Sequence, residues 1–197
     1  MEKMEVALKN RGYKVINMNY PSRKHPIEAL SKKTITQALT QSKKHSPDKI
    51  HFVTHSMGGI LIRHYLQKNT MSNLGKIVML SPPNQGSEVV DKLSGLKAFQ
   101  LLNGPAGSQL GTDSQSIPLN LDSINAEVGV ITGNRSINPL LSMLIPGAND
   151  GKVSGERARL EGMSGFLVVP HAHPFIMRNN GVIDQVIYFL KYGKFKR

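Results

Sequence analysis

Short apolar segments alternate with longer amphipathic segments along the whole chain, and this alternation constrains the fold more than any other feature. The apolar segments predict strands at Lys14–Asn19, Lys49–Val53, Lys76–Leu80, Val128–Thr132 and Phe166–Val169. Residues with a helical period predict helices at Met1–Arg11, Pro26–His45, from Gly59 through Leu66, and at Asn179–Leu190. Nearly continuous apolar strands separated by helices are typical of a parallel sheet covered on both faces. The sequence therefore predicts an α/β fold whose mostly parallel sheet has about five strands in this chain.

The length of 197 residues fits one domain that buries its own core, so we expect a single domain over residues 1–197. Residues 88–125 are the least regular part and carry turn signals at Gly104-Pro105 and Gly111-Thr112-Asp113. We expect this segment to be an insertion. The chain has no cysteine, which excludes disulfides, zinc fingers, iron–sulfur clusters and thiol catalysis.

The chain is strongly basic, with 25 lysines and arginines against 13 acidic residues. A positive surface favours contact with anionic partners such as a membrane surface, although it also simply keeps a protein in solution. No basic stretch is interleaved with aromatic residues and there is no tryptophan, so nucleic-acid binding is not expected. The sequence shows no signal peptide and no membrane-spanning segment. As given, it predicts a cytoplasmic protein, and export would need an N-terminal extension.

The most informative segment joins the predicted strand Lys49–Val53 to the following helix through Thr54-His55-Ser56-Met57-Gly58-Gly59. A serine among small residues at a strand-to-helix turn is typical of a nucleophile elbow. Gly58 and Gly59 allow the tight turn, and the backbone N–H of Met57 at the helix start can face a developing oxyanion. Thr54 stands where the common pattern has glycine, so the turn is expected to be looser there. His51 and His55 are expected to pack beside or beneath the turn.

A serine nucleophile needs a histidine base and a carboxylate that orients it. Asp150 lies in a polar turn after the strand Val128–Thr132, and the last strand is followed by Pro170-His171-Ala172-His173-Pro174. Both positions lie beyond the carboxyl ends of strands, where open α/β sheets place their sites. We predict Ser56, Asp150 and His173 as the catalytic residues, with His171 as the alternative base. The two histidines have neither cysteines nor clustered acids near them, so we expect no metal and no cofactor.

Four blocks of the sequence, VTHSMGGILIRHYL, LSPPNQGSE, PGANDGKVS and HAHPFIMRN, together resemble the lipase-like branch of the α/β-hydrolase superfamily. The resemblance runs from near Met1 to the C-terminus. It implies a serine esterase or lipase acting on a small-molecule or lipid ester, with Ser56 acylated, His173 moving the proton and Asp150 fixing the imidazole. It also implies that residues 88–125 form a cap, or lid, over the substrate.

The sequence departs from this family at its beginning. Family members place a strand and a His-Gly loop before the first helix, and that strand lies between the counterparts of Lys14–Asn19 and Lys49–Val53. We therefore expect a gap in the sheet at this place, a missing oxyanion donor, and self-association through the gap. A non-catalytic binding module and an acyltransferase with the same triad are the alternative functions.

Overall fold

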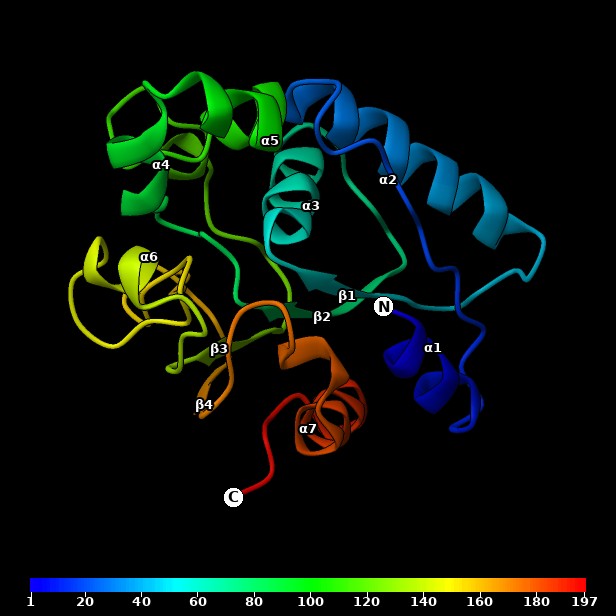
Figure 1. Cartoon of the computed structure of the whole chain (residues 1–197). Coiled ribbons are helices and arrows are strands. Elements are labelled where there is room, and N and C mark those ends of the chain that lie inside the picture. The colour runs from blue at the N-terminus through cyan, green and yellow to red at the C-terminus, as the bar shows by residue number, and fades with distance from the viewer.

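A parallel four-stranded sheet forms the centre of the molecule (Figure 1). The structure, a computed structural model, describes residues 1–197. The strands lie in the order β1 (Ile50–His55), β2 (Leu74–Leu80), β3 (Val128–Gly133) and β4 (Gly165–Val169). Each neighbouring pair is parallel, so the carboxyl ends of all four strands meet at one edge of the sheet.

Helices cover both faces of this sheet (Figure 1). One face carries α2 (Ile27–Lys43) and α3 (Met57–Lys68), and the other carries α1 (Glu2–Lys9) and α7 (Asn180–Tyr192). Apolar side chains of the strands pack against both layers, and all six residues of β3 are buried. The predicted α/β class and its parallel sheet are confirmed.

The helix α7 shows how local sequence sets these boundaries. Its buried face consists of Val182, Ile183, Val186, Phe189 and Leu190, which recur with the helical period. The Asn179 side chain accepts a hydrogen bond from the Val182 N–H and so caps the first turn. Gly193 ends the helix in the left-handed conformation, with φ of 73°. The predicted helix Asn179–Leu190 therefore corresponds closely to α7.

Two connections after the strands are also partly helical. The segment between β2 and β3 contains α4 (Glu88–Leu93), α5 (Lys97–Ser108) and a 3-10 turn, η1 (Pro118–Asn120), with a kink at Gly104 in α5. Its apolar residues pack on α2 and α3, and the Gln109 side chain accepts the Ile27 N–H. The short α6 (Pro139–Met143) follows β3, and a further 3-10 turn, η2 (Ile176–Arg178), follows β4.

The predicted strand at Lys14–Asn19 is wrong, and the sheet has four strands instead of about five. The segment makes no backbone hydrogen bond along its length. The physical reason is that a strand exists only through pairing with a neighbour, and β1, the nearest strand, lies across a cavity of about 670 Å³. In consequence β1 is the edge of the sheet, and all six of its residues are only half-buried.

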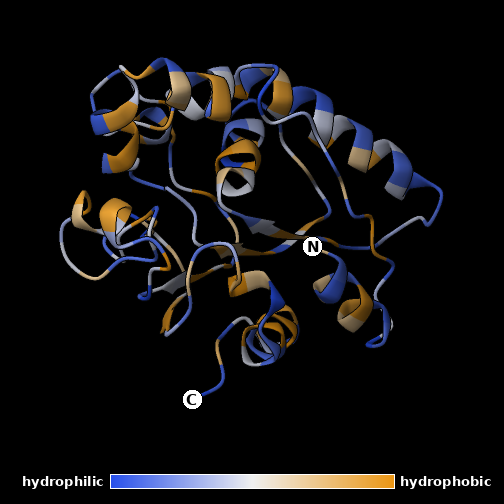
Figure 2. Ribbon diagram, in the orientation of Figure 1, coloured by the Kyte–Doolittle hydropathy of each residue, from blue (hydrophilic) through white to orange (hydrophobic).

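Hydrophobic residues concentrate in the strands and on α3 and α7, whereas hydrophilic residues predominate along the outer side of α2 and in many loops (Figure 2). None of the helices combines the length and the apolar character that crossing a membrane requires.

Candidate active site

Ser56 occupies the turn between β1 and α3 in a conformation that few residues adopt. Its φ is 53° and its ψ is −127°, which is strained for any residue with a side chain. Two backbone hydrogen bonds hold it there: the Ser56 N–H donates to the Leu80 carbonyl, and the Gly59 N–H donates to the Ser56 carbonyl. The turn is thus anchored to the neighbouring strand and to the first turn of α3.

The glycines after Ser56 leave room for this turn. A Cβ atom at Gly58 would lie 3.4 Å from the Thr54 Cβ, and one at Gly59 would lie only 3.0 Å from the Pro82 Cβ. At 3.4 Å, such a Cβ at Gly58 would be at the short limit of an ordinary van der Waals contact. Gly58 therefore makes room for the larger Thr54, whose hydroxyl is buried without a hydrogen-bond partner.

Loops that follow two other strands carry the side chains that face Ser56. The His173 Nε2 atom lies 2.9 Å from the Ser56 Oγ, and the His173 Nδ1 atom lies 2.8 Å from the Asp150 Oδ2. The two loops are also joined through their backbones, because the His173 N–H donates to the Asp150 carbonyl. The structure thus brings the three predicted residues together, although they are far apart in the sequence.

Asp150 is almost completely buried, with 1% of its surface exposed. Its Oδ1 atom accepts the N–H groups of Lys152 and Val153 at 3.0 and 2.9 Å, which leaves Oδ2 for the histidine. Burial raises the pKa of this carboxyl, but the hydrogen bond and charge of His173 and the backbone donors outweigh it and hold the pKa below its usual value. Asp150 is therefore ionised at neutral pH and accepts the Nδ1–H of His173.

Two other histidines lie near this group and play different parts. The His55 Nε2 atom lies 3.0 Å from the His173 carbonyl oxygen, and the two rings are 4.8 Å apart. Burial, followed by the charge of His173, lowers the pKa of His55 to about 3, so His55 is neutral and donates its Nε2–H to that carbonyl. The alternative base His171 lies on the same loop, but its ring makes no hydrogen bond to Ser56 or Asp150.

The N-terminus of α3 points at the same place. Met57 is the first residue of this 12-residue helix, so its N–H has no partner within the helix. The helix dipole adds a partial positive charge at this end. A negative oxygen that develops on a group bound to Ser56 would find this donor beside it. The structure contains no group of three or more acidic or histidine side chains arranged to hold a metal ion.

Solved structures resemble the fold of this chain, although no family model and no curated protein matches the sequence. Bacillus licheniformis lipase BlEst2 in its mature form superposes with a TM-score of 0.74 at 18% identity, over 95% of this chain and 83% of its own. Phospholipase PlaB from Legionella pneumophila superposes with a TM-score of 0.68 at 17% identity. A bromoperoxidase from Bacillus anthracis gives 0.57 at 14% identity. This chain has the α/β-hydrolase fold.

The coverage of these structures differs. The chain spans 55% of PlaB and 86% of the bromoperoxidase, but 46% of BlEst2 in its propeptide form. At identities below 20% the likeness concerns the α/β-hydrolase fold and its parallel sheet.

Sequence reasoning missed three residues that support the candidate site. A Cβ atom on Gly133, at the end of β3, would overlap the His171 carbonyl oxygen and lie 3.0 Å from the Asp150 Cβ. Asn149 is buried and accepts the Gly151 N–H, and its amide nitrogen lies within hydrogen-bond distance of one carbonyl of α6 and two of the following loop. His55, the third, was expected only to pack near the turn. In the sequence, the Asn149-Asp150-Gly151 run and the glycine at the end of the β3 strand were the only features that could have indicated these contacts.

Proposed function

We propose that this protein is a serine hydrolase that cleaves carboxylic esters through an acyl-enzyme on Ser56. The observation that carries the proposal is the unbroken chain of contacts from the Ser56 Oγ to the His173 Nε2 at 2.9 Å and from the His173 Nδ1 to Asp150 at 2.8 Å. This chain starts at a serine held in a strained strand-to-helix turn. The structures of a lipase and a phospholipase with the same fold support the choice of ester substrates.

The first half of the reaction forms the acyl-enzyme. Asp150 accepts the Nδ1–H of His173, so the Nε2 atom carries no proton and accepts the Ser56 hydroxyl proton. The Ser56 Oγ bonds to the ester carbonyl carbon, and the carbonyl oxygen becomes an oxyanion beside the Met57 N–H. When this intermediate collapses, the bond to the alkoxy group breaks. His173 then gives its proton to the departing alcohol.

The second half repeats these steps with water. His173 takes a proton from a water molecule, whose oxygen attacks the acyl carbon on Ser56. The intermediate collapses, the carboxylic acid leaves and the Ser56 Oγ recovers its proton from His173. Asp150 keeps the imidazole in one tautomer throughout and stabilises its positive charge. The hydrogen bond from His55 to the His173 carbonyl holds the loop in place.

Exposed apolar side chains on two connections support an apolar acyl group. Segment 88–125 exposes four leucines: Leu96, Leu101, Leu102 and Leu119. The connection after β3 exposes three further apolar residues on or near α6: Ile137, Leu140 and Met143. Both connections leave the edge of the sheet where Ser56 lies (Figure 1). We propose that residues 88–125 act as the cap over the acyl chain. Surfaces of this kind are typical of binding sites for apolar ligands.

Labelling with a fluorophosphonate probe, followed by the intact mass of the protein, tests the proposal. We expect one adduct on the wild type and none on Ser56→Ala. Ser72→Ala, which changes an exposed serine in the turn between α3 and β2, outside both the site and the cap, should label like the wild type. Hydrolysis of p-nitrophenyl butyrate should follow the same order. A folded wild type, as judged by circular dichroism, that takes no label would overturn the proposal.

A further inference from the structure

Ser87 is a buried serine whose hydroxyl bonds to a distant loop instead of to its own helix. It occupies the N-cap position of α4, with φ of −143° and ψ of 123°, where a serine side chain commonly accepts an N–H of the first turn. Its side chain makes no such cap. The Ser87 hydroxyl instead donates to the Lys152 carbonyl at 2.7 Å, across 65 positions of the sequence. The residue is 5% exposed.

The carbonyl that Ser87 contacts belongs to a peptide group with a second role. The Lys152 carbonyl and the Val153 N–H are the two ends of one planar peptide group. The Val153 N–H donates to the Asp150 Oδ1 atom at 2.9 Å. A hydrogen bond at the carbonyl end polarises such a group and makes its N–H a stronger donor. A continuous series of hydrogen bonds thus runs from Ser87 through this peptide group to Asp150, and through His173 to the nucleophile.

The orientation of this peptide group depends on Ser87. The Ser87 hydroxyl is the only donor to the Lys152 carbonyl. The second donor to the Asp150 Oδ1 atom, the Lys152 N–H, belongs to the adjacent peptide group of the same turn. Without the hydroxyl the turn loses the contact that orients it, and with it the fixed position of both donors to Asp150.

A second set of contacts joins the same loop to the base of the proposed cap. The Arg157 Nε atom lies 2.9 Å from the Glu88 Oε1 atom. The Gln85 N–H donates to the Arg157 carbonyl, and the Arg157 Nη1 atom donates to the Gln85 carbonyl. Ser87 lies between Gln85 and Glu88 in the sequence. The segment at which the cap begins is therefore attached to the loop after Asp150 at more than one point.

We propose that Ser87 is a positioning residue of the active site, an inference that rests on the function proposed above. Its hydroxyl fixes the peptide group between Lys152 and Val153, and this group holds the Asp150 carboxylate against the Nδ1–H of His173. Ser87 has no hydrogen bond to His173 or to the nucleophile, so it acts through Asp150. Because it directly precedes α4, it also links the proposed cap to the carboxylate that orients the base.

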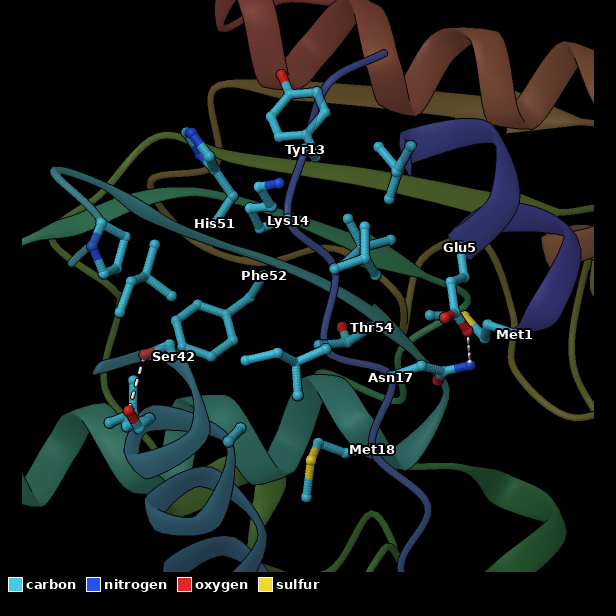
Figure 3. Close-up of a pocket in the computed structure, with 18 of the residues that line it drawn as sticks. Met1, Glu5, Tyr13, Lys14, Asn17, Met18, Ser42, His51, Phe52 and Thr54 are labelled. Atoms are coloured by element: carbon cyan, nitrogen blue, oxygen red, sulfur yellow. Dashed lines mark hydrogen bonds between the residues drawn. The ribbon is translucent and has the colours of Figure 1, made fainter. Parts of the chain in front are cut away.

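Ser87→Ala removes the hydroxyl, and two matched variants remove the same kind of hydrogen bond elsewhere. The Ser31 hydroxyl, fully buried in α2, donates to the Leu61 carbonyl at 2.8 Å. The Ser42 hydroxyl donates to the Leu39 carbonyl at 2.8 Å, at the wall of the cavity beside β1 (Figure 3). Neither bond leads to Asp150. Ser31→Ala should therefore lower the midpoint of urea unfolding about as much as Ser87→Ala does, without its effect on catalysis.

Steady-state hydrolysis of p-nitrophenyl butyrate separates positioning from stability. We expect kcat of Ser87→Ala to fall about 10–100-fold with KM nearly unchanged, whereas Ser31→Ala and Ser42→Ala keep the kcat of the wild type. Ser87→Thr keeps the hydroxyl on an extended backbone that suits a β-branched residue, so it should restore kcat. A kcat of Ser87→Ala close to that of Ser31→Ala overturns the proposal. An equal loss in a Ser87→Thr protein of wild-type stability overturns it as well.

A double-mutant cycle tests whether Ser87 acts through Asp150. In Asp150→Asn the carboxylate is already lost, so adding Ser87→Ala should slow fluorophosphonate labelling of Ser56 no further. Losses that multiply in the double variant contradict the proposal.

The NMR resonance of the His173 Nδ1–H gives a measurement that needs no substrate. It should move upfield in Ser87→Ala but not in Ser31→Ala, because a proton in a weaker hydrogen bond is more shielded. A resonance that stays in place in Ser87→Ala overturns the proposal. A shift in a protein whose wild type neither labels at Ser56 nor hydrolyses esters refutes the proposed function instead, and leaves the positioning of Asp150 by Ser87 supported.

Discussion

Replacing Asp150 with asparagine should stop catalysis while leaving the fold intact. The Asp150 Oδ1 atom accepts the N–H groups of Lys152 and Val153, and these two donors decide how the new amide is oriented. The amide oxygen of asparagine has to face them, because its NH₂ group would otherwise meet two donors. The NH₂ group then faces the His173 Nδ1 atom in place of the Oδ2 atom.

The consequence is the wrong tautomer of His173. An Nδ1 atom that accepts a hydrogen bond carries no proton, so the proton of the neutral ring moves to Nε2. The Nε2 atom then cannot accept the Ser56 proton. For the same substitution in a Ser-His-Asp protease the loss in kcat is about 10⁴-fold, and we expect a similar loss here, equal to about 5 kcal/mol.

The assay is steady-state hydrolysis of p-nitrophenyl butyrate together with the rate of fluorophosphonate labelling. We expect kcat to fall while KM changes little, because Asp150 is buried and does not contact the substrate. Asp184→Asn, on the exposed side of α7, is the control and should keep full activity. A loss of less than about tenfold in Asp150→Asn would refute the reasoning from tautomers.

Three further predictions follow from the same geometry. His173→Ala should abolish labelling of Ser56, whereas His171→Ala should retain it, because only the His173 ring reaches Ser56 and Asp150; equal losses in the two variants would contradict this. The pKa of His55 is lowered to about 3 in the folded protein, so between pH 6.5 and pH 3 its imidazole is protonated in the unfolded chain but not in the folded one. The free energy of unfolding should therefore decline as the pH falls through this window. His55→Gln should show a smaller decline in urea titrations. Gly133→Ala should destabilise the protein by about 1–3 kcal/mol and reduce its activity, because the new Cβ overlaps the His171 carbonyl. In the control Gly155→Ala the new Cβ has room, so thermal unfolding and hydrolysis assays should show unchanged stability and activity.

Local sequence was sufficient for most secondary-structure elements. The strands β1 to β4 and the helices α1, α2, α3 and α7 lie within a few residues of their predicted positions, because each has a clear apolar period and a recognisable end. The segment Lys14–Asn19 has the same β-branched character and forms no strand. Pairing with a neighbour depends on what lies beside a segment, and no local pattern records that.

Supporting contacts of the site could not be predicted in the same way. The hydrogen bond from His55 to the His173 carbonyl joins residues separated by 118 positions. The need for glycine at position 133 comes from the His171 carbonyl, which belongs to the loop after the next strand. Such contacts exist only once the strands are side by side.

The sequence by itself determined the class of fold and the residue types available for nucleophilic chemistry, because periodicity and the Ser56 turn are properties of neighbouring residues. It left His171 and His173 both open as the base, and it predicted a strand at Lys14–Asn19. Only the tertiary structure placed the His173 ring between Ser56 and Asp150 and left the edge of β1 unpaired. Both outcomes depend on distances between segments far apart in the chain, and the packing of the whole sheet and its helices sets those distances.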